Sequence, residues 1–278
     1  MTSQRNRLLD VCRGVLILIV VLGHSIQVVH GGEDNPLHVF IRSFQMELFF
    51  VISGVVAALG NAKPALVRIK GYFLRLCIPY VTWVFALYVA LCFFEHHSFS
   101  IFLFMKALAF SWFWFFRVLF SILILKELFF FLKTRISWLC VVPVMLVLCL
   151  AMTRVQTFFG VAHYAIYFTM GYLLSSEVYK LSLRSESVIV KALEWCGKNS
   201  LGIYAVHWNC LLVVLTQYFW SPRSLVASGF NEYFVALVVC AFWVSFSVGV
   251  VFVLKMNRLS AILFLGEGNR MRGGGRCT

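Results

Sequence analysis

Charged residues are scarce in this 278-residue chain, and they are kept out of long stretches of it. Only 13% of the residues are charged, whereas 62% are hydrophobic and the mean hydropathy is +0.90. This apolar fraction is far above that of soluble domains, which excludes an ordinary soluble protein. The sequence also lacks Pro-rich linkers and internal repeats of useful length. We therefore predict one membrane domain over residues 1–265, followed by a flexible, basic, Gly-rich tail at 266–278.

Cysteine is present but lacks the spacing that metal sites and disulfide frameworks require. The nine cysteines are scattered singly, without a CxxC motif, and most of them lie inside apolar runs. We interpret most of them as buried thiols that act as small hydrophobic residues, and we predict no metal and no bound cofactor. A cleavable signal peptide is not expected either. The first apolar run has no small-residue cleavage site, and Arg13 lies within it.

Eight apolar stretches are long enough to cross about 30 Å of hydrocarbon as helices of about 20 residues. They are too long for barrel strands, and helices satisfy their own backbone groups in lipid. We therefore predict an all-α integral membrane protein, a polytopic bundle of eight transmembrane helices. Residues 99–111 are apolar but short, so we interpret them as an interfacial or re-entrant outer helix, with a ninth span as the alternative. The eight spans are placed at residues 9–29, 39–60, 76–95, 112–132, 137–153, 158–176, 199–219 and 232–254.

The net charge of +13 is unevenly distributed, and its distribution indicates topology rather than binding to nucleic acid. If the spans alternate, the basic connectors all fall on one side, so the positive-inside rule predicts that both termini are cytoplasmic. The opposite connectors carry few bases and contain Glu33, Asp34, Glu95 and Glu232. The bases on the predicted cytoplasmic side are Arg5, Arg7, Lys63, Arg68, Lys70, Arg75, Lys133, Arg135, Lys180, Arg184, Lys191, Lys198, Lys255 and Arg258.

The first predicted span carries Asp10, Arg13, His24 and Gln27 within a narrow arc of the helix. A charged side chain at the centre of a membrane helix costs roughly 2.5 kcal/mol or more, so Arg13 requires a partner or a task. Eleven helical steps turn the chain by about 1100°, so Arg13 and His24 face the same way, about 16 Å apart. A purely structural role is the alternative: Asp10 would pair with Arg13, and His24 would form a hydrogen bond to a neighbouring helix. A polar stripe across most of a bilayer instead favours a functional cavity.

These side chains suit group transfer. His24 is able to take a proton from a hydroxyl near neutral pH, or to carry an acyl group on a ring nitrogen. Arg13 is suited to bind a phosphate or a developing oxyanion, and Asp10 to hold its guanidinium in place. Glu47, in the second span, would orient the His24 imidazole as a carboxylate does in a catalytic triad. Alternatively, Glu47 faces the outer interface together with Arg42.

Four motifs in order resemble the membrane-bound acyltransferase 3 family. They are RLLDVCRGVLILIVVLGHS, LFFVISG, YFLRLCIPYVTW and NSLGIYAVH. In that family the first helix typically carries an arginine, ten residues and a histidine, which Arg13 and His24 match. The other matches are to a phenylalanine pair before Ser-Gly and to a basic segment with Arg, a hydrophobic pair and Pro. They involve Phe49, Phe50, Ile52, Ser53, Gly54, Arg75, Leu76, Ile78 and Pro79.

The resemblance implies transfer of an acyl group, commonly acetyl from cytoplasmic acetyl-coenzyme A, to a hydroxyl of an envelope carbohydrate. It implies a multi-pass protein of the bacterial inner membrane, whose partners are acyl-CoA, a glycan or lipid-linked sugar, and the bilayer. Members usually have about ten spans, two more than we predict, and often have histidine at the position of Gln45. The predicted donor side comprises Asp10, Arg68, Lys70 and Arg75. Ordinary positive-inside topology is the alternative explanation of these cations.

Further polar and aromatic side chains are candidates for binding the acceptor. Trp114 and Arg117 open the fourth span, where an aromatic ring and a cation suit a sugar ring or a lipid pyrophosphate. His163 and His207 place hydrogen-bonding groups in the sixth and seventh spans. An interfacial aromatic belt and packing between helices are the alternatives. The rival function is a transporter or flippase, because polar helix faces would also line a solute path.

Overall fold

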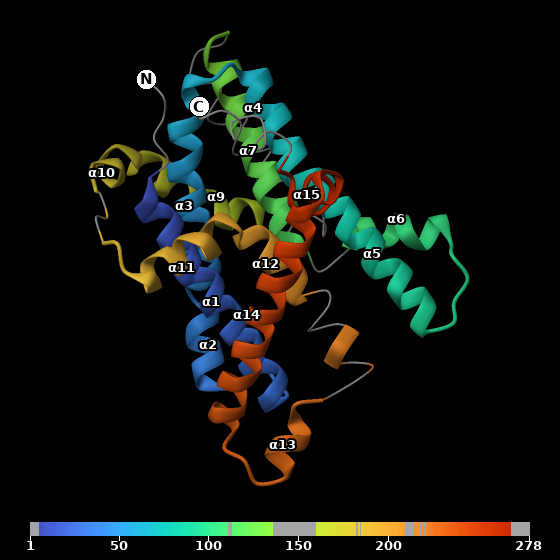
Figure 1. Ribbon diagram of the computed structural model, residues 1–278. Helices are drawn as coiled ribbons and strands as arrows, with labels where there is room; N and C mark the ends of the chain where they lie inside the picture. The colour runs from blue at the N-terminus through green and yellow to red at the C-terminus, as the bar shows by residue number, and fades with distance from the viewer. Residues whose placement is uncertain are drawn as a thin grey trace, which may run out of the picture. The chain divides into compact units, whose positions relative to one another are not determined.

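A computed structural model describes residues 6–110, 113–135, 160–181, 183, 185–208, 214–216, 218 and 221–267, with the side chains of Ala62 and Phe110 left aside. Within these ranges the chain is helical and contains no β-strand, which confirms the predicted all-α class. Figure 1 shows the elements in chain order. They are α1 (Arg7–His30), α2 (Pro36–Arg42), α3 (Gln45–Leu59), η1 (Gly60–Ala62), α4 (Ala65–Tyr72), η2 (Phe73–Cys77), α5 (Ile78–Phe94), α6 (Ile101–Phe110), α7 (Trp114–Lys133), α9 (Val161–Leu173), α10 (Ser175–Lys180), α11 (Val188–Lys198), α12 (Ser200–Val206), α13 (Arg223–Ala227), α14 (Glu232–Met256) and α15 (Arg258–Leu265).

The described residues include four helices that are long and apolar enough to span a membrane. They are Arg7–His30, Pro36–Leu59, Ala65–Phe94 and Glu232–Met256, and a bent pair, Ile101–Ala109 with Trp114–Lys133, passes the same test across a 66° bend. The protein is thus a multi-pass helical membrane protein. The predicted span at 137–153 lies outside the described residues, as do residues 209–213, 217 and 219 of the predicted span at 199–219 and most of the tail. The count of eight spans, the orientation of the termini and the single domain stay predictions.

The predicted basic connector between the second and third spans is helical rather than a loop. After Pro64, residues Ala65–Tyr72 form α4, and a π-helical turn, η2, leads directly into α5. Ala, Leu, Arg and Lys are good helix formers, and Pro fits at the start of a helix. The helix that contains the predicted third span therefore begins about eleven residues before that span, at Ala65 rather than residue 76.

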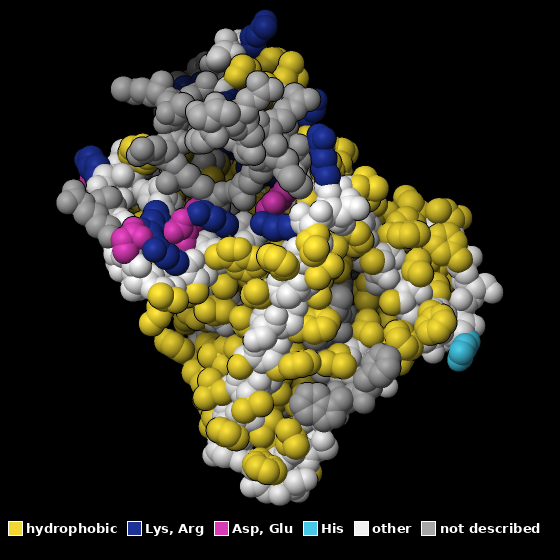
Figure 2. Space-filling view, in the orientation of Figure 1, with side chains coloured by type: hydrophobic (Ala, Val, Ile, Leu, Met, Phe, Trp, Pro, Cys, Tyr) yellow, Lys and Arg dark blue, Asp and Glu magenta, His cyan; other side chains and the backbone are white. Residues whose placement is uncertain are grey.

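The chain divides into two compact units, each of which is described separately. The first contains Met1–Leu59, Ala90–His97 and Ile166–Val251, and the second contains Gly60–Val89, Ser98–Ala165 and Phe252–Thr278. In Figure 2 hydrophobic side chains cover the outward face of α14, as expected for a helix in contact with lipid. They include Phe234, Leu237, Val238, Phe242 and Phe246.

Helix α1 is well defined at both ends. Asn6 caps its first turn by accepting a hydrogen bond from the Leu8 amide at 2.9 Å. Gly31 ends it in the left-handed conformation, with φ of 90°, which glycine adopts without steric cost. Its Leu16, Ile17 and Val20 side chains are buried in the first unit. Residues 7–30 are therefore a continuous rod that carries both Arg13 and His24.

Helix α11 packs against α1 through a seam of two glycines. A Cβ atom at Gly14 would overlap the Leu193 carbonyl of α11, and one at Gly197 would overlap the Asp10 carbonyl of α1. Only hydrogen fits at both positions, so the two backbones are in direct contact. A similar close approach joins α3 to α9, where a Cβ at Gly54 would overlap the Phe168 carbonyl.

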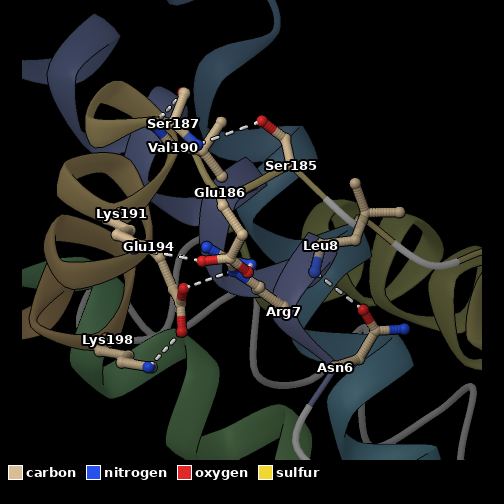
Figure 3. Close-up of polar contacts among 10 residues, drawn as sticks. All are labelled: Asn6, Arg7, Leu8, Ser185, Glu186, Ser187, Val190, Lys191, Glu194 and Lys198. Carbon is tan, nitrogen blue, oxygen red and sulfur yellow. Dashed lines mark hydrogen bonds and ion pairs between the residues drawn. The ribbon is translucent and has the colours of Figure 1, made fainter.

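Arg7 anchors the start of α1 to the segment around α11, as Figure 3 shows. Its Nη1 donates to Glu186 Oε1 and its Nε to Glu194 Oε2, both at 2.7 Å. Glu194 also pairs with Lys198, and Glu186 Oε2 lies 3.2 Å from Lys191 Nζ. The Lys198 and Arg7 side chains lower the pKa of Glu194 below its ordinary value of 4.5. Arg7 and Lys191 lower the pKa of Glu186 in the same way.

We expect this cluster to make the protein less stable in acid. Both carboxyl pKa values are lower in the folded state than in the unfolded chain, so their stabilisation is present above pH 4.5 and is lost as the pH falls through the folded values. The apparent Tm in detergent should therefore fall between pH 6 and pH 3. In the double variant Glu186→Gln/Glu194→Gln the fall should be shallower. A double variant with the pH slope of the wild type would contradict this assignment.

Candidate active site

His24 has a defined tautomer because of its neighbour on α1. Its Nδ1 lies 3.1 Å from Gln27 Oε1, and Gln27 Nε2 lies 3.4 Å from Glu33 Oε1. A carboxylate only accepts hydrogen bonds, so Gln27 turns its NH₂ toward Glu33 and its oxygen toward His24. His24 Nδ1 is then the proton donor. Its Nε2 keeps a lone pair, which is the form that acts as a base or nucleophile.

His207 lies beside His24, although it comes from a different predicted span. The two ring centroids are 5.6 Å apart with a 32° tilt, and the Trp208 ring stands edge-on to His24 at 4.7 Å. His207 is fully buried, and its Nδ1 lies 3.0 Å from the Ile203 carbonyl. Because a carbonyl only accepts, Nδ1 carries the proton in His207 as well. The structure thus brings together two imidazoles with the same tautomer.

Asp10 and Arg13 lie near the opposite end of α1 from His24. Asp10 is buried, with 2% of its surface exposed, and Arg13 is partly buried one helical turn further along. The backbone carbonyl of Asp10 lies against Gly197 of α11, so Asp10 is part of the glycine seam. Because α1 is unbroken, Arg13 and His24 keep the predicted separation of about 16 Å along its axis.

Gln27, rather than Glu47, contacts His24 Nδ1. Glu47 is in the first turn of α3 and is partly buried, and its role at His24 stays a prediction. Arg42, which the alternative interpretation places at the outer interface together with Glu47, pairs with Glu33. The neighbouring Gln45 is buried, with 5% of its surface exposed.

In the second unit, Arg68 belongs to a buried charge cluster. Its Nε donates to Glu127 Oε1 at 2.9 Å, and Lys126 Nζ lies 2.8 Å from the same oxygen. Tyr72 donates its hydroxyl to Glu127 at 3.1 Å, and Lys126 also donates to Asn61 Oδ1 at 3.1 Å. The Arg68 guanidinium therefore already has an anionic partner. Of the other cations predicted on the donor side, Lys70 and Arg75 are exposed.

Two of the predicted acceptor residues contact the same tyrosine in the second unit. Trp114 stacks on Tyr164 with ring centroids 5.1 Å apart and planes at 26°. His163 stands edge-on to Tyr164 at 4.8 Å and is exposed to the surroundings. Arg117 donates to the Ala109 carbonyl, which fixes its guanidinium against the end of α6. Trp114 and His163 thus flank one aromatic ring, while His207 belongs to the first unit.

A family model described as an acyltransferase domain matches residues 6–186, which is more than half of the chain and includes α1 with Arg13 and His24. The chain belongs to the acyltransferase 3 family. It is also similar to the nodulation protein NolL of Sinorhizobium fredii, with 34% identity over 87 residues. That match covers 29% of this chain and 24% of NolL, so the chain spans about a quarter of this relative. No solved structure matches the chain.

For an acyltransferase, the first unit offers imidazole chemistry at His24 and His207. Within the described ranges, no group of three or more His, Cys, Asp or Glu side chains is arranged to hold a metal ion. The described features that suit transfer are the His24 lone pair, the adjacent His207 and the distant Arg13.

Sequence reasoning did not identify Gln27 as the partner of His24, nor Glu127 and Lys126 as partners of Arg68. The Lys-Glu pair inside the apolar fourth span was a usable signal, because adjacent charges in hydrocarbon require partners just as Arg13 does. Gln27 gave a weaker signal. Its position one turn after His24 was visible, but the direction of its amide depends on where Glu33 folds.

Proposed function

We propose that this protein transfers an acyl group, expected to be acetyl, from cytoplasmic acyl-CoA to a hydroxyl of an envelope or surface carbohydrate of the O-antigen, capsule or exopolysaccharide type. The observation that carries the proposal is the His24 geometry. A partly buried imidazole on a membrane-spanning helix donates through Nδ1 to Gln27 and keeps its Nε2 lone pair for the reaction. Membership of the acyltransferase 3 family supports the same reaction class.

In the proposed mechanism, His24 Nε2 takes the proton of the acceptor hydroxyl while the oxygen attacks the thioester carbonyl. The tetrahedral oxyanion then collapses, the carbon–sulfur bond breaks, and the coenzyme A thiolate takes the proton from His24. In a second route, Nε2 attacks the thioester carbonyl, the carbon–sulfur bond breaks, and the coenzyme A thiolate leaves. The hydroxyl then attacks the acyl-imidazole, His24 leaves as the neutral ring, and the hydroxyl proton passes to the thiolate. The Gln27 contact serves both routes, because it keeps Nε2 unprotonated until the reaction begins.

Arg13 and the cationic segment supply the donor side of this proposal. The guanidinium would bind a coenzyme A phosphate or the oxyanion, with Asp10 holding it, and Arg68, Lys70 and Arg75 would attract the nucleotide. About 16 Å of α1 separates Arg13 from His24, which suits an extended pantetheine arm reaching along the helix. Trp114, Arg117, His163 and His207 are proposed to contact the sugar. We propose this arrangement for a protein with eight spans in a bacterial inner membrane and both termini in the cytoplasm.

Purified protein in detergent or lipid with labelled acetyl-CoA tests the function directly. Release of the free coenzyme A thiol, together with an acyl ester on an added envelope glycan fraction, is the expected result. A transporter or flippase would leave the thioester intact. Mass spectrometry of surface glycans from cells with and without the protein would identify the acceptor, and unchanged acylation in both experiments would overturn the proposal.

Gln27→Leu should slow acyl transfer by roughly 10-fold to 100-fold, because the imidazole then loses the acceptor that selects its tautomer. Initial rates with labelled acetyl-CoA measure the effect. Val28→Ala changes the next residue on the same helix and should stay within twofold of the wild type. Equal rates in the two variants would show that Gln27 does not position His24.

A further inference from the structure

Several buried polar atoms of the first unit have no hydrogen-bond partner among the described residues, and two of the acceptors lie near His24. These two are His207 Nε2 and Gln45 Oε1, on side chains that are 0% and 5% exposed. Leaving a buried polar atom unpaired costs about 1–3 kcal/mol, so such atoms in a folded protein call for an explanation. A bound ligand that donates hydrogen bonds would provide one.

Both atoms lie close to His24. The His207 and His24 ring centroids are 5.6 Å apart. Gln45 Oε1 would lie 3.5 Å from a Cβ atom built on Gly23, the residue that precedes His24. The Gln45 amide oxygen thus lies beside the backbone of α1 at the residue next to the candidate base.

The chemistry of these atoms restricts the ligand. His207 Nδ1 carries its proton toward the Ile203 carbonyl, so Nε2 is able only to accept in the neutral ring. The reacting thioester group has no donor to offer, whereas each hydroxyl of a sugar has one. The hydroxyl that reacts gives its proton to His24. An acceptor with another hydroxyl beside the reacting one brings a second donor to His207, whereas the nearest donor of the coenzyme A arm is the amide N–H two carbons beyond the sulfur.

We propose that His207 Nε2 accepts a hydrogen bond from a hydroxyl adjacent to the one that is acylated, with Gln45 Oε1 as a further acceptor site. This inference rests on the proposed acyl transfer and narrows its acceptor to compounds with neighbouring hydroxyls. His207 is then a specificity-determining residue. An acceptor without the second hydroxyl leaves the buried lone pair unpaired and is disfavoured by about 10-fold or more.

The test uses the full-length protein, acetyl-CoA, and three small pyran acceptors: tetrahydropyran-4-ol and the cis and trans isomers of tetrahydropyran-3,4-diol. Two readouts are measured, ester formation by mass spectrometry and protection of His24 from diethyl pyrocarbonate by peptide mapping. The second readout reports binding without turnover. The variants are His207→Phe, which keeps a ring but removes the acceptor nitrogen, and His207→Gln, which keeps an acceptor oxygen.

In the wild type, at least one diol should be favoured over the mono-ol by about 10-fold in both readouts. His207→Phe should bring that ratio close to one, and His207→Gln should restore part of it. Ser247→Ala is the matched control, because Ser247 Oγ is also buried and has no hydrogen-bond partner in the described part of the chain. Helix α14 meets the end of α1 at Glu232, which contacts His30, and Ser247 is 15 residues further along α14. Its ratio should equal that of the wild type.

The two proposals fail in different ways. Protection by the diols without any ester would overturn the proposed function but support the binding site. Equal protection by the diols and the mono-ol, no protection by any of the three, or an unchanged preference in His207→Phe would overturn the role of His207. A water molecule that satisfies Nε2 would produce such an unchanged preference.

Discussion

His24→Ala should lower acyl transfer by a factor of about 10² to 10⁴, which is the usual contribution of a positioned general base. The loss should appear in kcat, because the alanine side chain removes the proton acceptor without removing the Arg13 side of the donor site. Initial rates with labelled acetyl-CoA, at saturating donor and in parallel with a thermal melt, measure it. The melt should show that the variant still folds, because His24 is only partly buried.

His30→Ala is the matched control for this experiment. His30 lies on the same helix and bonds through Nδ1 to Glu232 Oε2 at 3.0 Å, so it is a histidine with a structural partner. Its variant should transfer acyl groups within about twofold of the wild type. Added imidazole should restore part of the activity of His24→Ala but have no effect on His30→Ala. A rate near that of the wild type in His24→Ala would overturn the mechanism.

Glu127→Ala should destabilise the protein by about 3–5 kcal/mol, because it removes the anion from two buried cations. The Arg68, Lys126 and Glu127 side chains are 12%, 7% and 5% exposed, so water replaces the lost carboxylate poorly. The expected readout is a large drop in apparent Tm or in the denaturant midpoint in detergent. The Tm or midpoint of Glu127→Gln should lie between those of the wild type and Glu127→Ala, since the amide oxygen still accepts one hydrogen bond.

Glu177→Ala provides the comparison for an exposed ion pair. Glu177 and Lys180 are neighbours on α10, and their side chains are 66% and 69% exposed. Such pairs are worth about 0–1 kcal/mol, so the midpoint should barely move. Equal shifts in Glu127→Ala and Glu177→Ala would mean that the Arg68 cluster is hydrated rather than buried.

Hydropathy and charge identified the polar residues whose free-energy cost in an apolar helix does not depend on how the helices pack. Arg13 and His24 stood out because polar groups in an apolar run are expensive wherever the helix packs. The contact between His24 and His207 had no such signal, because the two residues are separated by 183 positions and meet only through tertiary packing. For the same reason, Glu127 could not be matched to Arg68 from spacing alone.

The ends of the helices depend on helix propensity and on capping, which a hydropathy window does not include. The charges of Arg68 and Lys70 lowered the local hydropathy and suggested a loop, yet both residues are good helix formers and α4 continues through them. Hydropathy gave the second span as residues 39 to 60, and the structure has one span-length stretch there, Pro36–Leu59. Hydropathy did not show that this stretch consists of two consecutive helices, which begin at Pro36 and at Gln45. Asn35 caps the first of these by accepting from the Leu37 amide.

The glycine seam between α1 and α11 also fixes the rotational setting of α1. Asp10 and Gly14, four residues apart, face α11, so α1 cannot turn about its own axis without driving a side chain into the α11 backbone. Measured from Gly14, Arg13 and His24 point about 100° and 80° to the same side of the helix. The close contacts at Gly14 and Gly197 thus hold Arg13 and His24 about a quarter-turn from the face of α1 that contacts α11.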